Sequence, residues 1–453
     1  MVPNADPSRV PVASLVADAE SSARLFRLLR TADLRIKTAL EHADELRLQI
    51  LVTHFVPAAA AGKPASPDKP SLSLIPRTAS FRASDEYLYP ASTIKLLTAT
   101  CALRALQNLQ AAGAPVNART PLRFHAAFGD QSIEDRDATN LGYEADDACA
   151  GCPSGDRPAD ATNLGYEADD AADSSGAFLP ACPPGVICLE HEIRKSLVVS
   201  DNPAHNRLYT FVGHERVNTL CSELGLASTL INHRLSEFRS RDEQRHTGRV
   251  DFLEHPHTSR ERVIATIPAR TSDLILENPP TLRGLNIGRA HFLNDARIET
   301  PMDFSWRNRH TLEDMQRALV MLVRPELLSD PSGLTPRHRA LICDALWPLP
   351  RQSVNPRFDP TDYSDASNKF VAAGRASAHL RARGRIFNKV GQAYGFTLDN
   401  AFLTTPNFFI AIGLYTNPGE VLGDDSYTYA PAVPLIARIA SAIAASPDFT
   451  TPA

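Results

Sequence analysis

The C-terminal part of the chain constrains the fold most strongly, because its hydrophobic pattern changes period there. Residues 384–416 are predicted to form three consecutive strands, with turn signals at Tyr394-Gly395 and Pro406-Asn407. An apolar helix is predicted over 430–446. A meander of this kind has to bury a face under other elements. The chain is therefore expected to contain an antiparallel sheet covered by helices.

The N-terminal part supplies matching elements. Residues 18–43 show helical spacing of apolar side chains, and residues 46–56 alternate and are rich in β-formers. Residues 57–80 are rich in Ala, Pro, Ser and Lys and are predicted to be a loop. We expect one sheet, built from the N- and C-terminal segments and flanked by the terminal helices. The middle of the chain would form a second, all-helical lobe, which makes the predicted fold class α/β (α+β).

The expected domain organisation is a single domain behind a short tail. Its two lobes are discontinuous in sequence, because the sheet needs both ends of the chain. The predicted boundaries are a tail at 1–17 and a domain at 18–450, with a sheet lobe at 18–90 and 381–450 and a helical lobe at 91–380.

A segment of different composition interrupts the predicted helical lobe. Residues 126–187 are acidic and rich in Gly, Pro, Ala and Asp. The sequence DATNLGYEADDA occurs at 137–148 and again at 160–171. Two copies with few apolar residues cannot stack into a repeat core. The prediction is a mobile acidic insertion lengthened by a local duplication.

Composition excludes some partners. The net charge is −5 and 43% of the residues are hydrophobic, as in ordinary globular enzymes. No Lys/Arg block suggests nucleic-acid binding, and no apolar run approaches the length of a membrane span. The first residues lack the basic and apolar regions of a signal peptide. The composition therefore predicts neither a nucleic-acid partner nor a membrane span, and a monomer is expected.

A serine and a lysine one helical turn apart mark the candidate site. Ser92 and Lys95 lie where an apolar helix is predicted to begin. Positions i and i+3 share a helix face, and the free N–H groups of a helix start favour negative charge. The same spacing recurs at Ser66 and Lys69, but in a proline-containing loop. Taken alone, Ser92 and Lys95 could equally be a helix-start serine and a surface lysine.

Two further motifs follow in order. Ser200-Asp201-Asn202 comes just after a helical run, and Lys389-Val390-Gly391 lies in the first strand of the C-terminal meander. The former also fits a helix cap, with Pro203 in the first turn. Lys389 also fits a lysine that guards a sheet edge. The order of the three motifs favours a catalytic interpretation.

Together these motifs resemble the signature of the serine β-lactamase and penicillin-binding protein superfamily, and of its class A β-lactamases in particular. The resemblance covers about residues 18–446. It implies a serine hydrolase that forms an acyl-enzyme on Ser92 and hydrolyses a β-lactam or a related amide or ester, a chemistry associated with antibiotic resistance. One alternative is a penicillin-binding, DD-peptidase-like protein with slow deacylation. The other is a non-catalytic protein that binds peptide or cell-wall fragments.

The resemblance also assigns roles. Ser92 would be the nucleophile, Lys95 its base, and Ser200 a proton relay. Asn202 and Lys389 would bind the substrate, together with the strand at Gly391 and Gln392. The backbone N–H groups of Ser92 and Gln392 would form the oxyanion hole.

Two departures from the family pattern bear on activity. Val390 replaces a hydroxyl residue, which removes one donor to a substrate carboxylate. The deacylating glutamate of class A enzymes has no clear counterpart. The candidates are Glu237 and Glu243, although aligning Arg234-Leu235 with the family loop places Arg239 at the glutamate position.

No cofactor and no metal are expected. Four cysteines, Cys149, Cys152, Cys182 and Cys188, could bind zinc or form two disulfides, and disulfides are favoured in an oxidising compartment. The resemblance implies a periplasmic or extracellular enzyme acting on a small-molecule or peptidoglycan-like substrate. Because no signal peptide is visible, a cytoplasmic location stays open.

Overall fold

A computed structural model describes residues 15–57, 74–143, 181–293, 295–328, 332–374, 377–424 and 426–450. The second copy of the duplicated segment, Cys149, Cys152 and most of the predicted tail lie outside these ranges. Of the seven cysteines, five are described, and all five are buried.

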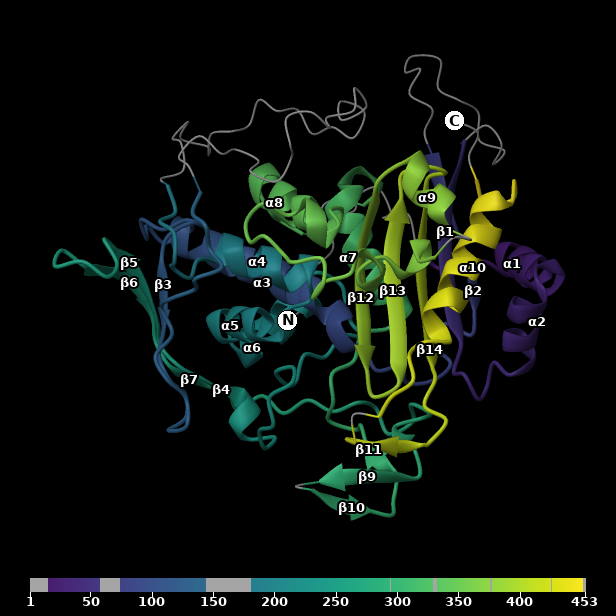
Figure 1. The fold of residues 1–453 in the computed structure, drawn as a ribbon, viewed down its shortest axis with the longest axis horizontal. Coiled ribbons are helices and arrows are strands. Elements are labelled where there is room, and N and C mark those ends of the chain that lie inside the picture. Colours follow the sequence, from purple (N-terminus) through teal and green to yellow (C-terminus); the bar gives the residue numbers. More distant parts are fainter. Residues whose placement is uncertain are drawn as a thin grey trace, which may run out of the picture.

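A five-stranded antiparallel sheet forms the centre of the molecule (Figure 1). The C-terminal meander supplies three strands, and the N-terminal segment supplies the other two. Both ends of the chain therefore build one sheet, as predicted. The strand order is β12 (Ile386–Ala393), β13 (Phe396–Leu403), β14 (Phe408–Tyr415), β1 (Gln49–Pro57) and β2 (Leu74–Phe81).

The two faces of the sheet belong to different cores. In β14, Phe408, Ile410 and Ile412 pack with the terminal helices, whereas Phe409 packs with the helical lobe. This alternation follows from the period of two along a strand. Both faces are thus covered by helices. On the outer face these are α1 (Ala19–Thr31), α2 (Leu34–Glu41) and α10 (Ala432–Ala445).

Two details of the N-terminal region differ from the prediction. The helix expected over 18–43 is broken, because Asp33 caps a new helix by accepting a hydrogen bond from Ile36 N at 3.1 Å. Strand β2 lies within the segment predicted to be a loop. Its Pro76 pairs opposite Phe55 at the edge of the sheet, where a missing N–H is tolerated.

The helical lobe carries the expected helices and also short strands. The fold class is confirmed, because helices and an antiparallel sheet combine as predicted. The lobe is not all-helical, however, since strands β3 to β11 lie within it. The longest is β6 (Arg262–Ile267), which pairs with β5 (Val250–Glu254), and β5 pairs with β3 (Leu122–Phe124). The other short strands are β4 (His246–Thr247), β7 (Arg270–Thr271), β8 (Asn286–Ile287), β9 (Ala290–Leu293), β10 (Ala296–Ile298), β11 (Met302–Asp303) and β15 (Val421–Leu422).

The helices of the lobe pack around α3, which follows the candidate nucleophile. They are η2 (Ala91–Ile94), α3 (Lys95–Ala111), α4 (Leu189–Val198), α5 (Asn202–Val212), α6 (His214–Glu223), α7 (Leu312–Val323) and α8 (Pro336–Leu346), with α9 (Ala378–Arg383) leading back to the sheet. No helix in the described ranges is long and apolar enough to cross a membrane.

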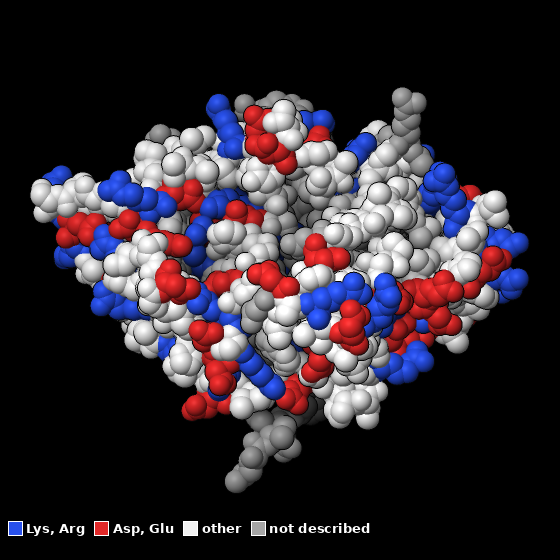
Figure 2. Space-filling model, turned by 60° about the horizontal axis from the view of Figure 1, so that its bottom comes forward, with Lys and Arg blue, Asp and Glu red and all other residues white. Residues whose placement is uncertain are grey.

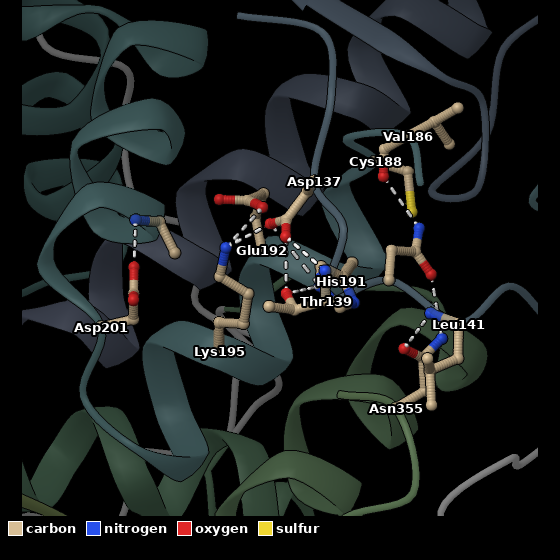
Figure 3. Close-up of polar contacts among 12 residues, drawn as sticks. Asp137, Thr139, Leu141, Val186, Cys188, His191, Glu192, Lys195, Asp201 and Asn355 are labelled. Atoms are coloured by element: carbon tan, nitrogen blue, oxygen red, sulfur yellow. Dashed lines mark hydrogen bonds and ion pairs between the residues drawn. The ribbon is translucent and has the colours of Figure 1, made fainter. Parts of the chain in front are cut away.

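The described part of the duplicated segment is packed against the lobe, contrary to the expectation of a mobile insertion over all of 126–187 (Figure 3). Asp137 forms an ion pair with Lys195, and Thr139 Oγ1 lies 3.1 Å from His191 Nε2. Asn140 is 1% exposed and donates to Val186 O at 2.9 Å. Leu141 N donates to Asn355 Oδ1 at 2.9 Å. The polar side chains of this stretch are therefore held by hydrogen bonds and an ion pair to residues from other segments.

Candidate active site

Ser92 lies in the short helical turn η2, at the N-terminal start of α3. The prediction of a helix beginning at this serine agrees with the structure. Ala91 adopts a positive φ of 48°, and Thr93 Oγ1 donates to Pro90 O at 2.7 Å, which fixes the turn. The Ser92 side chain is partly exposed. A serine held in this way on a turn can be reached from solvent.

Lys95 is the first residue of α3 and is completely buried. Its Nζ donates to the carbonyl oxygen of Ser200 and, at 2.6 Å, to Asn202 Oδ1. Burial and the nearby positive charge of Lys389 hold the pKa of Lys95 well below its usual value, with Asp201 opposing this effect. Burial therefore favours the neutral amine of Lys95, which is the form that can accept a proton. Within the described residues, its Nζ makes no hydrogen bond to Ser92 Oγ.

The Ser200-Asp201-Asn202 motif forms the turn between α4 and α5. Asp201 caps α5 by accepting from Ala204 N at 2.6 Å, and its own N–H donates to Lys195 O at 3.2 Å (Figure 3). Ser200 takes a positive φ of 64°. The predicted cap is present, and it holds Ser200 and Asn202 next to Lys95. The Ser200 Oγ lies 3.2 Å from Lys95 Nζ.

Lys389 reaches the same serine from the sheet. It lies on β12, the edge strand, and its Nζ donates to Ser200 Oγ at 2.9 Å. Its side chain is buried, and burial lowers the pKa of Lys389 to about 7; Asp399 opposes this effect and Lys369 adds to it. The Ser200 hydroxyl therefore connects two lysines from different lobes. Such a chain can carry a proton between them.

The Lys389 strand also approaches the Ser92 turn closely. A Cβ at Gly391 would lie 2.8 Å from Pro90 O and 3.0 Å from Ser92 N, so only glycine allows this contact. Gln392 follows and is exposed. Val390 points into the core under the terminal helices, where a hydroxyl would meet apolar neighbours. Seven of the eight predicted site residues thus lie in or directly beside one cluster.

Glu237 is the exception. Its carboxylate accepts from Arg239 Nε at 2.9 Å, Gln131 Nε2 at 3.2 Å and Asn206 Nδ2 at 3.3 Å. Glu243 is partly exposed and accepts from Ser240 N at 2.8 Å. In the described part of the chain, neither glutamate hydrogen-bonds to the Ser92 cluster. The structure does not bring the two candidate bases to the site.

Ser236 occupies the place beside Asn202 instead. It is exposed, has a positive φ of 52°, and its Oγ accepts from Asn202 Nδ2 at 2.7 Å. Sequence reasoning missed this residue, because a serine one position before the expected glutamate carries no motif. The segment that carries the predicted glutamates therefore reaches the site, but through a hydroxyl.

A buried polar network behind β12 was also missed. Asn388 donates to Asp399 Oδ1 at 2.8 Å and accepts from Lys369 Nζ, and Val371 N donates to Asp399 Oδ2 at 2.9 Å. Burial raises the pKa of Asp399 to about 6 and lowers that of Lys369 to about 7. The only sequence signal is an acidic residue inside the apolar strand FTLDNAFL.

Replacing Asp399 with asparagine is expected to lower the free energy of unfolding by about 3 kcal/mol near pH 7.5. The change removes the negative charge that faces the buried Lys369. Removing one member of a buried charge pair destabilises the fold by more than the intact pair stabilises it, because the other charge is left without a partner. Urea unfolding measures the loss. The matched control is Asp44→Asn, which breaks an exposed ion pair with Arg82 and should cost less than about 1 kcal/mol. Equal losses in both variants would contradict the expectation.

The face shown in Figure 2 carries no extended block of one charge. Acidic and basic side chains are interspersed there, between broad areas of uncharged residues. The charged groups that distinguish the candidate site are buried. They are Lys95 and Lys389, whose amines both contact Ser200 beside the partly exposed Ser92. This arrangement is suited to acyl transfer.

Comparison with protein families gives one match. The model of the beta-lactamase enzyme family matches residues 159–446, which include Ser200, Asn202 and Lys389 and begin after Ser92 and Lys95. No curated protein sequence matches the chain.

Three solved structures illustrate the similarity. They are the β-lactamase of Sphaerobacter thermophilus DSM 20745 (15% identity, TM-score 0.40, covering 94% of this chain and 96% of that one), a class A β-lactamase of Mycobacterium abscessus (14%, 0.38, 93% and 97%) and the protein PBP-A (12%, 0.42, 95% and 96%). The family match extends over more than half of the chain, and the protein therefore belongs to the beta-lactamase enzyme family, within the serine β-lactamase and penicillin-binding protein superfamily.

Proposed function

We propose that this protein is a serine hydrolase that forms an acyl-enzyme on Ser92 with a β-lactam or a related amide or ester. The observation that carries the proposal is the buried Lys95, which lies within hydrogen-bond distance of Ser200 and Asn202 one turn after an accessible serine. A buried lysine with a lowered pKa is a suitable general base.

The proposed acylation step uses the groups of the cluster in turn. Lys95 accepts the Ser92 proton while Oγ attacks the carbonyl carbon of the substrate. The backbone N–H of Ser92 and that of Gln392 stabilise the oxyanion. The C–N bond then breaks, and the proton passes through Ser200 Oγ to the leaving nitrogen. Asn202 orients the substrate amide, and Lys389 attracts an anionic group of the substrate.

Deacylation is expected to be slow. The glutamates proposed from the sequence are held in other interactions, and Ser236 stands next to Asn202. A serine hydroxyl is a poor base for activating water at neutral pH. These contacts favour the penicillin-binding, DD-peptidase-like alternative over a fast β-lactamase.

The intact mass of the protein after mixing with excess benzylpenicillin tests the proposal. We expect a gain of one penicillin that persists for many minutes and is absent from Ser92→Ala. A gain that clears while penicillin is consumed would overturn the slow-deacylation part and support a β-lactamase. No gain with the wild-type protein, or an equal gain with Ser92→Ala, would overturn acylation of Ser92. Reversible binding without a mass gain would support the non-catalytic alternative.

A further inference from the structure

Two thiols lie in contact away from the candidate active site. The Sγ atoms of Cys182 and Cys188 are 3.3 Å apart, and the two side chains are 2% and 0% exposed. They form a small buried cluster with Tyr143 and Val186. A disulfide bond is about 2.05 Å long, so the sulfur atoms need to approach by only about 1.3 Å to bond.

The backbone holds both cysteines in place. Cys182 pairs with Tyr143 through two hydrogen bonds, of 2.9 and 3.0 Å, and Gly185 N donates to Asn140 O at 2.8 Å. Gly185 has a positive φ of 74°, which returns the chain from Cys182 towards α4. Cys188 is the residue before α4, and its side chain does not cap that helix. The Cys188 thiol therefore does not serve as the N-cap of α4, and Cys182 lies outside that helix.

We propose that Cys182 and Cys188 are a redox modification site, at which a low-molecular-weight disulfide such as oxidised glutathione converts the two thiols into an intramolecular disulfide. The Cys182 thiolate attacks the oxidant, forms a mixed disulfide and releases one glutathione thiolate. Cys188 then attacks the Cys182 sulfur, and the second glutathione leaves. Two thiols are oxidised, one glutathione disulfide is reduced, and the two protons pass to the released thiolates or to solvent.

The surroundings assign the order of these steps. Asn140 Nδ2 lies 3.5 Å from Cys182 Sγ. Hydrogen bonds from Cys188 and Asn140 lower the pKa of Cys182, against the effect of burial. Burial and the Cys182 contact raise the pKa of Cys188. Cys182 is therefore the first nucleophile, and Cys188 resolves the mixed disulfide.

The cross-link would tie two parts of the helical lobe together. Cys182 belongs to the backbone pair that joins residues 143 and 182, and Cys188 begins α4, which ends just before Ser200. A disulfide restricts the unfolded chain and leaves these native contacts in place. The oxidised protein is expected to melt about 2–5 °C higher than the reduced protein.

The test treats the reduced full-length protein with oxidised glutathione, followed by thiol counting in denaturant and peptide mapping. We expect two of the seven thiols to be lost, a cross-linked peptide joining Cys182 and Cys188, and recovery of both thiols with dithiothreitol. The variant Cys149→Ser/Cys152→Ser should react in the same way, as should the buried control Cys343→Ser. Cys182→Ser and Cys188→Ala should each abolish the cross-link.

Three outcomes would overturn the proposal. They are an unchanged thiol count, a stable glutathione adduct without the internal bond, and a cross-link that maps to other cysteines. The last case includes Cys149, Cys152 or the Cys101 and Cys221 pair of the lobe core, whose side chains also interact.

Discussion

Replacing Lys95 with alanine is expected to slow acylation of Ser92 by benzylpenicillin by about 10³-fold or more at pH 7.5. General bases contribute about 10² to 10⁴ to such steps, and Lys95 is the only amine in hydrogen-bond contact with both Ser200 and Asn202 in the described residues. The measurement is the rate of mass gain under single-turnover conditions. Lys95→Arg should be equally slow, because a guanidinium does not lose its proton.

The pH dependence of acylation separates a base from a structural lysine. Because burial and Lys389 hold the pKa of Lys95 below its usual value, the wild-type rate should reach its plateau well below pH 10. The control Lys37→Ala changes a lysine on an exposed stretch of α2 and should acylate at the wild-type rate. A Lys95→Ala variant that folds normally and acylates within threefold of the wild-type rate would reject the proposed role.

The protein is also expected to unfold cooperatively at mildly acidic pH, with a midpoint of about pH 5. Among the described residues, burial lowers the pKa of seven histidines in the folded state, so the unfolded chain binds protons that the folded chain excludes. Stability is therefore lost as the pH falls from about 6.5 towards 4. These histidines are His54, His191, His214 and His338, with pKa values of about 4, His233 and His310, with values of about 3, and His205, whose pKa also lies well below its usual value.

The magnitude follows from proton linkage. Each histidine contributes on the order of 1–2 kcal/mol of destabilisation by pH 5, so together they approach the whole stability of a typical domain. Asp399, with a raised pKa of about 6, and Asp314, whose pKa burial also raises, act in the opposite direction because they add stability as the pH falls, but they are two groups against seven. The free energy of unfolding is therefore expected to fall as the pH falls.

Urea unfolding at half-unit steps from pH 7.5 to 4.5 measures this dependence. Replacing His310 with glutamine should flatten the slope by about one proton, whereas His42→Gln, at a side chain that is 54% exposed, should leave it unchanged. A free energy of unfolding that stays constant between pH 7 and 5 would contradict the linkage argument.

Local patterns predicted much of the architecture and of the candidate site. Ser92 and Lys95 could be found because a helix start and a spacing of three are properties of contiguous residues. The cap at Asp201 and the meander of β12 to β14 are local in the same sense. The expectation that Ser200 and Lys389 belong with Lys95 came from motif order, and the structure places the three side chains in contact.

Other features depended on partners distant in sequence. Strand β2 was not predicted because the alternation of apolar and polar residues in it is weak. It forms a strand because it pairs with β1. The first copy of the duplicated segment has a polar, loop-like composition, yet Asn140 is buried because Asn355 and Val186 meet it there. The same holds for the Lys369, Asn388 and Asp399 network behind the site.

The sequence alone thus determined which residues are candidates for the proposed chemistry, and the tertiary structure decided which of them meet. Torsional preference, helix capping and hydrophobic period act over a few residues, so they can be predicted from the chain itself. Whether Glu237 faces the substrate or an arginine depends on how the segment around 236 settles against α5 and residues 130–131. The orientation of Glu237 therefore depends on packing between segments that are distant in sequence, because burial and charge pairing are properties of the assembled fold.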